Sequence, residues 1–211
     1  GSRPEKLITE KSSTDPLDFY AQQKYLSERA AGWLNKAPTI LRFGTLFGMS
    51  PRMRFDLVIN LFVAQAIQEN EITVFGGDQY RPFLHVNDAA DALIFSLEKN
   101  LTGTYNVISE NLTIKQAAEK ISDATGCKIN ISNENEDKRN YKVSAKKLMQ
   151  VGFHPSKTID DAITEIKEAI ENGDITNYAD EKFSNYKLLF GSKEMQEKVF
   201  MLGIPGSLDV P

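Results

Sequence analysis

Two residues near the start of the chain, Tyr20 and Lys24, form the pair best suited to chemistry. On a helix with about 3.6 residues per turn, side chains at this spacing share one face and can reach a common ligand. A neighbouring ammonium stabilises a phenolate and so lowers a tyrosine pKa from its usual value of about 10. Tyr20 is therefore a candidate general acid or base near neutral pH.

The Tyr-x-x-x-Lys spacing has little weight by itself. A chain with 7 tyrosines and many lysines can contain this spacing by chance. A second pair with the same spacing occurs at Tyr178 and Lys182. The alternative for either pair is a solvated helix face. The surrounding sequence has to decide between the two.

The elements that must position these side chains alternate between helix and strand. For the first helix, Asp15 is a candidate N-cap and Pro16 a candidate first residue. The expected helices are 18–35, 57–68, 89–99, 113–126, 145–150 and 158–173, and the expected strands are 39–43, 72–75, 80–86, 104–108 and 127–132. Such alternation predicts an α/β fold.

Composition and charge exclude several classes of protein. A net charge of -4 and a pI near 5.4 argue against nucleic-acid binding. The single cysteine, Cys127, cannot form an intrachain disulfide, and no Cys/His cluster predicts a metal site. No apolar run is long enough to span a bilayer, and no signal-peptide pattern is present. We expect a soluble cytoplasmic protein without a membrane partner.

Four segments in order resemble the extended short-chain dehydrogenase/reductase family, specifically its NAD-dependent nucleotide-sugar epimerases and dehydratases. They are Tyr20–Glu28 with the Tyr-x-x-x-Lys pair, Leu41–Gly48 (LRFGTLFG), Gly76–Asp88 (GGDQYRPFLHVND) and Asp137–Ser144 (DKRNYKVS). This order is far more specific than one spacing. Tyr178 and Lys182 match nothing in the family and are expected to be a surface pair.

The resemblance implies the carboxyl-terminal part of a Rossmann-like doubly wound sheet plus a smaller α/β substrate-binding domain. The expected units are residues 1–50 (remainder of the NAD-binding domain), 51–175 (mainly nucleotide-sugar binding) and 176–211 (tail). No Gly-x-Gly-x-x-Gly loop is present, and the family places that loop and a catalytic Ser or Thr before the tyrosine. The chain by itself is therefore expected neither to bind NAD productively nor to turn over substrate.

The resemblance also implies roles for residues around the cofactor. Tyr20 would act as general base on the sugar hydroxyl, and Lys24 would hold the nicotinamide ribose. Phe43 and Thr45 would contact the cofactor, which is expected to be NAD, with NADP possible. The chain departs from the family pattern at Gln23 (usually Ser) and at Thr45 (usually Asn).

The nucleotide-diphosphate sugar would contact a second set of residues. Arg81 and Arg139 are the expected diphosphate ligands, because arginine offers planar bidentate donors to phosphoryl oxygens. Thr45, Asp56 and Leu57 complete the expected substrate contacts. The family's Asp after Arg81 is a proline here, which indicates a subgroup with its own sugar.

The function that the resemblance implies is nucleotide-sugar epimerisation by transient oxidation at C4. A 4,6-dehydratase or reductase of the same family remains open, as does a non-catalytic dinucleotide-binding relative. A homodimer is expected through the first helix, with Trp33 and Tyr25 as packing or interface residues. His85, on an apolar strand, is expected to be a core histidine rather than a ligand.

Overall fold

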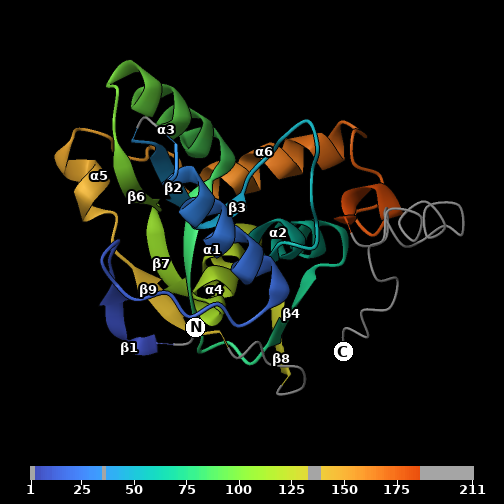
Figure 1. Cartoon of the computed structure of the whole chain (residues 1–211). Helices are drawn as coiled ribbons and strands as arrows, with labels where there is room; N and C mark the ends of the chain where they lie inside the picture. The colour runs from blue at the N-terminus through green and yellow to red at the C-terminus, as the bar shows by residue number, and fades with distance from the viewer. Residues whose placement is uncertain (1–2, 35–36, 133–138, 186–211) are drawn as a thin grey trace, which may run out of the picture.

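The computed structural model describes residues 3–34, 37–132 and 139–185 as an α/β arrangement (Figure 1). The helices are α1 (Phe19–Ala31), α2 (Val58–Gln68), α3 (Val86–Glu98), α4 (Ile114–Thr125), α5 (Lys146–Gln150), α6 (Ile159–Glu171) and a 3-10 turn (Glu181–Phe183). The strands are β1 (Arg3–Ile8), β2 (Thr39–Phe43), β3 (Thr45–Phe47), β4 (Glu71–Phe75), β5 (Tyr80–His85), β6 (Gly103–Val107), β7 (Glu110–Thr113), β8 (Lys128–Ser132) and β9 (Tyr141–Val143).

Most strand pairs are parallel, as an α/β fold requires. Parallel pairs join β2 with β6, β3 with β5, β4 with β8 and β1 with β9, while β5 and β7 run antiparallel. The β2–β6 register runs from Thr39 opposite Gly103 to Phe43 opposite Val107. Within the described ranges β2 pairs on one edge only.

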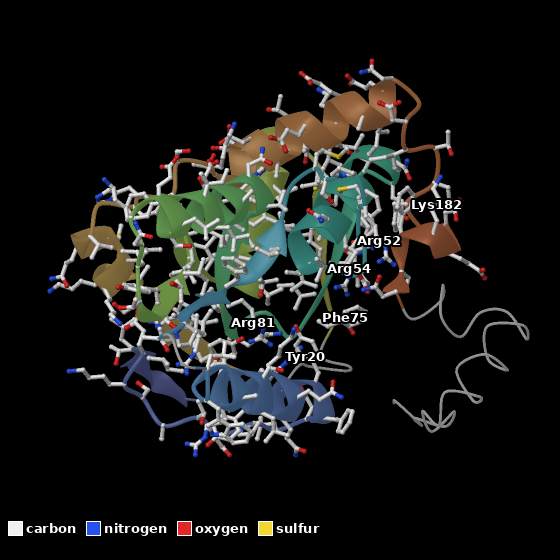
Figure 2. All side chains as sticks on the ribbon, turned by 45° about the horizontal axis from the view of Figure 1, so that its top comes forward. Tyr20, Arg52, Arg54, Phe75, Arg81 and Lys182 are labelled. Carbon is white, nitrogen blue, oxygen red and sulfur yellow. The ribbon has the colours of Figure 1, made fainter. Side chains whose placement is uncertain are left out.

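Two apolar clusters hold these elements together. The larger one lies where α2, α4 and α6 meet β3, β4 and β5, and it includes the fully buried Val63, Ile72, Phe83, Ile121 and Ile166. The smaller one lies beneath α3 and α5 on β5 and β6. Figure 1 shows α6 running beside α2 across one side of the molecule, and the turned view of Figure 2 shows α1 apart from the other helices.

Local sequence signals explain where two of the packed helices begin and end. The Thr113 hydroxyl accepts from the backbone N–H of Gln116, whose side chain accepts from the Thr113 N–H. The same helix, α4, ends at Gly126 with φ of 77°, which confirms the predicted glycine stop. Asp161 accepts from the backbone N–H and hydroxyl of Thr158 at the start of α6.

The predicted start of α1 is wrong. The helix begins at Phe19, and Asp18 rather than Asp15 is its cap, because the Asp18 Oδ1 accepts from the Ala21 N–H at 2.7 Å. Pro16 therefore precedes the helix. The predicted helix end at Asn35 lies outside the described residues, but the regular helix already ends at Ala31.

Four strands were not predicted: β1, β3, β7 and β9. All are short or polar, and each exists through its partner strand rather than through its own pattern. The predicted boundaries between units at residues 50 and 175 fall outside regular elements, in the β3–α2 connection and after α6. Of the predicted tail, 176–211, the structure describes residues through 185.

Candidate active site

The predicted catalytic pair lies on an exposed helix face. Tyr20 is 68% exposed, and the Lys24 Nζ lies 5.4 Å from the centre of its ring. This cation–π distance places the ammonium and the phenol on the same side of α1, as the spacing predicted. Figure 2 shows Tyr20 on the side of α1 that faces Arg81, Phe75 and Arg54.

Arg54 lies across from Tyr20 and is held in place by Asp56. Its Nε and Nη2 donate to the two carboxylate oxygens of Asp56 at 2.9 and 2.8 Å. These hydrogen bonds are the main reason that the pKa of Arg54 is raised, and the negative charge available to the Tyr20 phenol adds to the effect. Tyr20 and Arg54 are therefore within electrostatic reach, and a bidentate carboxylate keeps the guanidinium in one orientation.

Arg81 is nearly buried, with 6% of its surface exposed. Its Nη1 donates to the carbonyls of Tyr80, at 2.8 Å, and Arg139, and its guanidinium lies 5.7 Å from the Tyr141 ring. The Tyr80 N–H donates to the Asn140 Oδ1 at 3.0 Å. Arg81 therefore joins β5 to the segment that carries the exposed Arg139. Binding of a diphosphate by either arginine remains a prediction.

The other predicted ligand residues lie at the ends of elements. Phe43 is exposed at the end of β2, and Thr45 is half-buried in β3, in register with Phe83. Leu57 immediately precedes α2 and is half-buried. Phe43 and Thr45 thus flank one strand connection, and Leu57 lies at the start of the helix that follows the next loop.

The loop 48–54, between β3 and α2, carries Arg52 and Arg54. A single buried amide ties its two ends, because Asn60 accepts from the Gly48 N–H at 2.9 Å and donates to the Arg54 carbonyl at 3.0 Å. Asn60 is 3% exposed. Both ends of its amide are therefore engaged within the loop.

The second Tyr-x-x-x-Lys pair lies in a different environment. The Tyr178 hydroxyl donates to Glu69, and burial followed by that carboxylate raises the tyrosine pKa. Lys182 lies 3.7 Å from Asp180. A carboxylate beside the phenol opposes its ionisation, so Tyr178 is unsuited to act as a base.

Two further residues lie near the predicted site. Arg54 falls in the substrate region of the family pattern, with an ion pair to Asp56 or Glu69 as the alternative, and the structure shows the pair with Asp56. Phe75 is a large apolar side chain left exposed at the end of β4, and Figure 2 shows it on the side of the molecule toward α1. An aromatic residue directly before two glycines was the available signal in the sequence.

Neither metal nor membrane features appear in the part of the chain that the structure describes. Across residues 3–34, 37–132 and 139–185, no three His, Cys, Asp or Glu side chains gather in a way that would hold a metal ion. In the same ranges every helix is too short or too polar to cross a membrane.

Comparisons with known proteins give the family. The model of the NAD dependent epimerase/dehydratase family matches residues 1–107, just over half of the 211-residue chain. An uncharacterized UDP-glucose epimerase of Bacillus subtilis is 30% identical over 129 residues, which cover 57% of this chain and 40% of that protein.

Solved structures agree on the fold. A UDP-glucose 4-epimerase of Thermus thermophilus in complex with NAD is 22% identical with a TM-score of 0.64, covering 81% of this chain and 60% of that one. A dTDP-glucose 4,6-dehydratase of Bacillus anthracis in complex with NAD is 23% identical with a TM-score of 0.66, covering 82% and 59%. The predicted Rossmann-like α/β class is confirmed, and the chain spans well under two thirds of these relatives. The chain belongs to the NAD dependent epimerase/dehydratase family.

Proposed function

We propose that this chain supplies the catalytic tyrosine and the nucleotide-sugar side of an NAD-dependent nucleotide-sugar epimerase. The observation that carries the proposal is the position of Tyr20, beside Lys24 on one helix face and within electrostatic reach of Arg54. Once ionised, a tyrosine beside an ammonium can accept a proton from a sugar hydroxyl. The alternative pair, Tyr178 and Lys182, lacks this environment.

The proposed reaction oxidises the sugar at C4 and then reduces it on the other face. NAD, when bound, supplies the hydride acceptor and then the hydride donor. Tyr20, once ionised, would take the proton of the C4 hydroxyl as the sugar is oxidised and would return it as the sugar is reduced. Lys24 would hold the cofactor ribose and stabilise negative charge on the Tyr20 oxygen.

The residues present are compatible with a dinucleotide on the β2 side. Tyr20, Lys24 and Phe43 all present exposed side chains, and β2 has an edge without a partner strand within the described ranges. We propose that Phe43 and Thr45 contact the cofactor, and that a glycine-rich half like that of the longer relatives pairs along this edge.

The nucleotide-sugar is proposed to lie on the other side of Tyr20. Thr45, Asp56, Leu57, Arg81 and Arg139 remain the proposed substrate contacts. Arg139 is the exposed cation among them, and Arg54 joins the set from the structure. The relatives named above act on UDP- and dTDP-sugars according to their names, which supports this ligand class. The homodimer and the cytoplasmic location remain predictions from the sequence.

Replacement of Tyr20 by phenylalanine tests the proposal. In the enzyme with its dinucleotide-binding half in place, Tyr20→Phe should lower kcat by a factor of about 10²–10⁴, the usual contribution of a positioned general base. Bound NAD, measured by nicotinamide absorbance after release, should be unchanged. The control is Tyr178→Phe, which removes the hydroxyl of the second pair and should leave kcat near its original value. Near-normal turnover in Tyr20→Phe would exclude the proposed role.

A further inference from the structure

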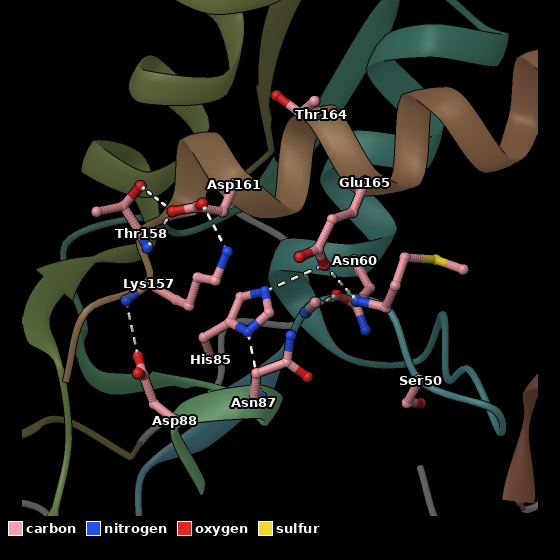
Figure 3. Close-up of polar contacts among 12 residues, drawn as sticks. Ser50, Asn60, His85, Asn87, Asp88, Lys157, Thr158, Asp161, Thr164 and Glu165 are labelled. Carbon is pink, nitrogen blue, oxygen red and sulfur yellow. Dashed lines mark hydrogen bonds and ion pairs between the residues drawn. The ribbon is translucent and has the colours of Figure 1, made fainter. Parts of the chain in front are cut away.

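A carboxylate from the far end of the chain reaches the loop that presents the arginines. The Met49 N–H donates to the Glu165 Oε2 at 3.1 Å, across a sequence separation of 116 residues. Glu165 lies on α6. This helix belongs to the part of the molecule that surrounds the larger apolar cluster, namely α2, α4 and α6 with β3, β4 and β5, which we call the packed half. Figure 3 shows its side chain extending from α6 toward Asn60 and His85. The loop 48–54 is thus attached both to α2, through Asn60, and to α6.

A buried histidine holds this carboxylate in one position. The His85 Nε2 lies 3.2 Å from the Glu165 Oε2, and the imidazole is 0% exposed. The His85 Nδ1 accepts from the Asn87 N–H at 3.2 Å, so this nitrogen carries no proton. Nε2 is therefore the protonated nitrogen and donates to Glu165. One carboxylate oxygen receives two hydrogen bonds, one of them from the loop.

The surroundings leave the histidine little freedom to move. The Phe47 ring packs edge-on against it, with ring centres 5.2 Å apart. Gly48 passes so close that a Cβ there would lie 2.2 Å from the His85 Nε2. The predicted role of His85 as a core residue agrees with its burial, and the structure adds that it orients Glu165. His85 on β5 thus fixes the Glu165 carboxylate, and this carboxylate fixes the Met49 end of the loop 48–54.

We infer that Glu165 is a positioning residue for nucleotide-sugar binding, because it fixes the loop 48–54 that presents Arg52 and Arg54. The inference rests on the proposed function. Figure 2 shows α1 presenting Tyr20 toward Arg54, so a shift of the loop moves this cation relative to the proposed site. The role requires a hydrogen-bond acceptor at the carboxyl position and no negative charge. Glutamine at position 165 can fill it, and leucine cannot.

The experiment compares three variants of the enzyme with its dinucleotide-binding half in place. Glu165→Leu should raise the KM for a UDP-sugar about tenfold with a smaller change in kcat, because misplaced binding groups weaken positioning. Glu165→Gln should restore KM to within about twofold of the original, since its amide oxygen accepts from the same donors. Glu168→Leu makes the same chemical change on an exposed position of α6 and should leave KM unchanged.

Hydrogen exchange of the Met49 amide gives a readout that does not depend on turnover. It should accelerate in Glu165→Leu and return to the original rate in Glu165→Gln. The inference is overturned if Glu165→Leu keeps the original KM, or if Glu165→Gln is as impaired as the leucine variant. Failure of the unaltered enzyme to bind or convert any nucleotide-sugar would instead overturn the proposed function, and that result is distinguishable because it appears without any substitution.

Discussion

Helices α1 and α6 have the same length, 13 residues each, but they are attached to the molecule in opposite ways. Helix α6 buries Ile159, Ala162, Ile163, Ile166 and Ala169 in the larger cluster. Helix α1 has no buried residue, and its Phe19 and Leu26 are 67% and 62% exposed. A polar link joins it to β2, where the Glu28 carboxylate accepts from the Arg42 Nε and Nη2 at 2.9 and 2.6 Å.

This difference separates the two halves of the proposed site. The loop 48–54 is anchored by residues of the packed half, so the described chain itself determines where Arg54 lies. Tyr20 lies on a helix without a buried residue, which a partly exposed ion pair joins to β2. The absence of buried residues on α1, with Phe19 and Leu26 exposed, fits the proposal that this helix contacts further polypeptide.

The largest expected difference in the free energy of unfolding is between one substitution in the core of α6 and one on the exposed face of α1. Ile166→Ala should lower the free energy of unfolding by about 2–5 kcal/mol, because it removes a fully buried side chain. Leu26→Ala removes an exposed side chain of similar size and should change it by less than about 0.5 kcal/mol. Urea unfolding of the 211-residue chain, followed by circular dichroism, measures both. Equal losses would show that α1 is packed as firmly as α6.

The second comparison uses two glycines, one in each half. Gly48 has a φ of 97° and no room for a Cβ beside His85, so Gly48→Ala should lower the free energy of unfolding by about 2–4 kcal/mol. Gly32, the C-cap of α1, has a φ of -67°, which alanine adopts freely. Gly32→Ala should therefore change it by less than about 1 kcal/mol.

Thermal unfolding of the two glycine variants, monitored at the same protein concentration, provides the measurement. A Gly48→Ala protein as stable as the original would mean that His85 can move aside. That result would weaken the rigid attachment of the loop 48–54, and it would leave the contrast between α1 and α6 untouched.

Most helices and strands of the packed half could be predicted, because the sequence signals for them lie within each element or directly beside it. Apolar periodicity predicted α2, α4 and α6, and Thr113 and Gly126 marked both ends of α4. The apolar strand around His85 predicted its burial. These signals depend on neighbours within a few residues, so no knowledge of tertiary contacts was needed.

The parts that could not be predicted depend on contacts between distant segments. Nothing near Glu165 indicates that its carboxylate accepts from Met49, because the partners come from separate elements that meet only in the fold. The strand β9 exists through its pairing with β1. Near the start of α1 the sequence has two acidic residues that could serve as the N-cap, and Asp18 rather than Asp15 makes the capping hydrogen bond. The family resemblance indicated Tyr20. Its surroundings could not be predicted, because Arg54 and Phe75 come from distant segments whose positions only the structure gives.

The smallest expected effect comes from the caps of the same two helices. Hydrogen bonds from Thr158 and the ammonium of Lys157 lower the pKa of Asp161 to about 2, below the ordinary 3.8. A carboxyl whose pKa is lower in the folded state stabilises the fold above its ordinary pKa and loses that effect as the pH falls toward 2. Asp161→Ala should therefore cost about 1 kcal/mol at pH 7, limited by solvent screening of a side chain that is 34% exposed, and much less near pH 2.5.

Asp18→Ala is the matched control, because Asp18 caps α1 with a single hydrogen bond to the Ala21 N–H. Loss of this cap should reduce the helical signal, because the first turn of α1 frays. It should leave the free energy of cooperative unfolding unchanged, since no side chain of α1 is buried in the clusters that unfold together. Urea titrations at pH 7 and pH 2.5 on both variants separate these outcomes. A pH-dependent loss in Asp161→Ala alone would place the cooperative unit in the α6 half, whereas a matching loss in Asp18→Ala would extend that unit to the helix that carries Tyr20.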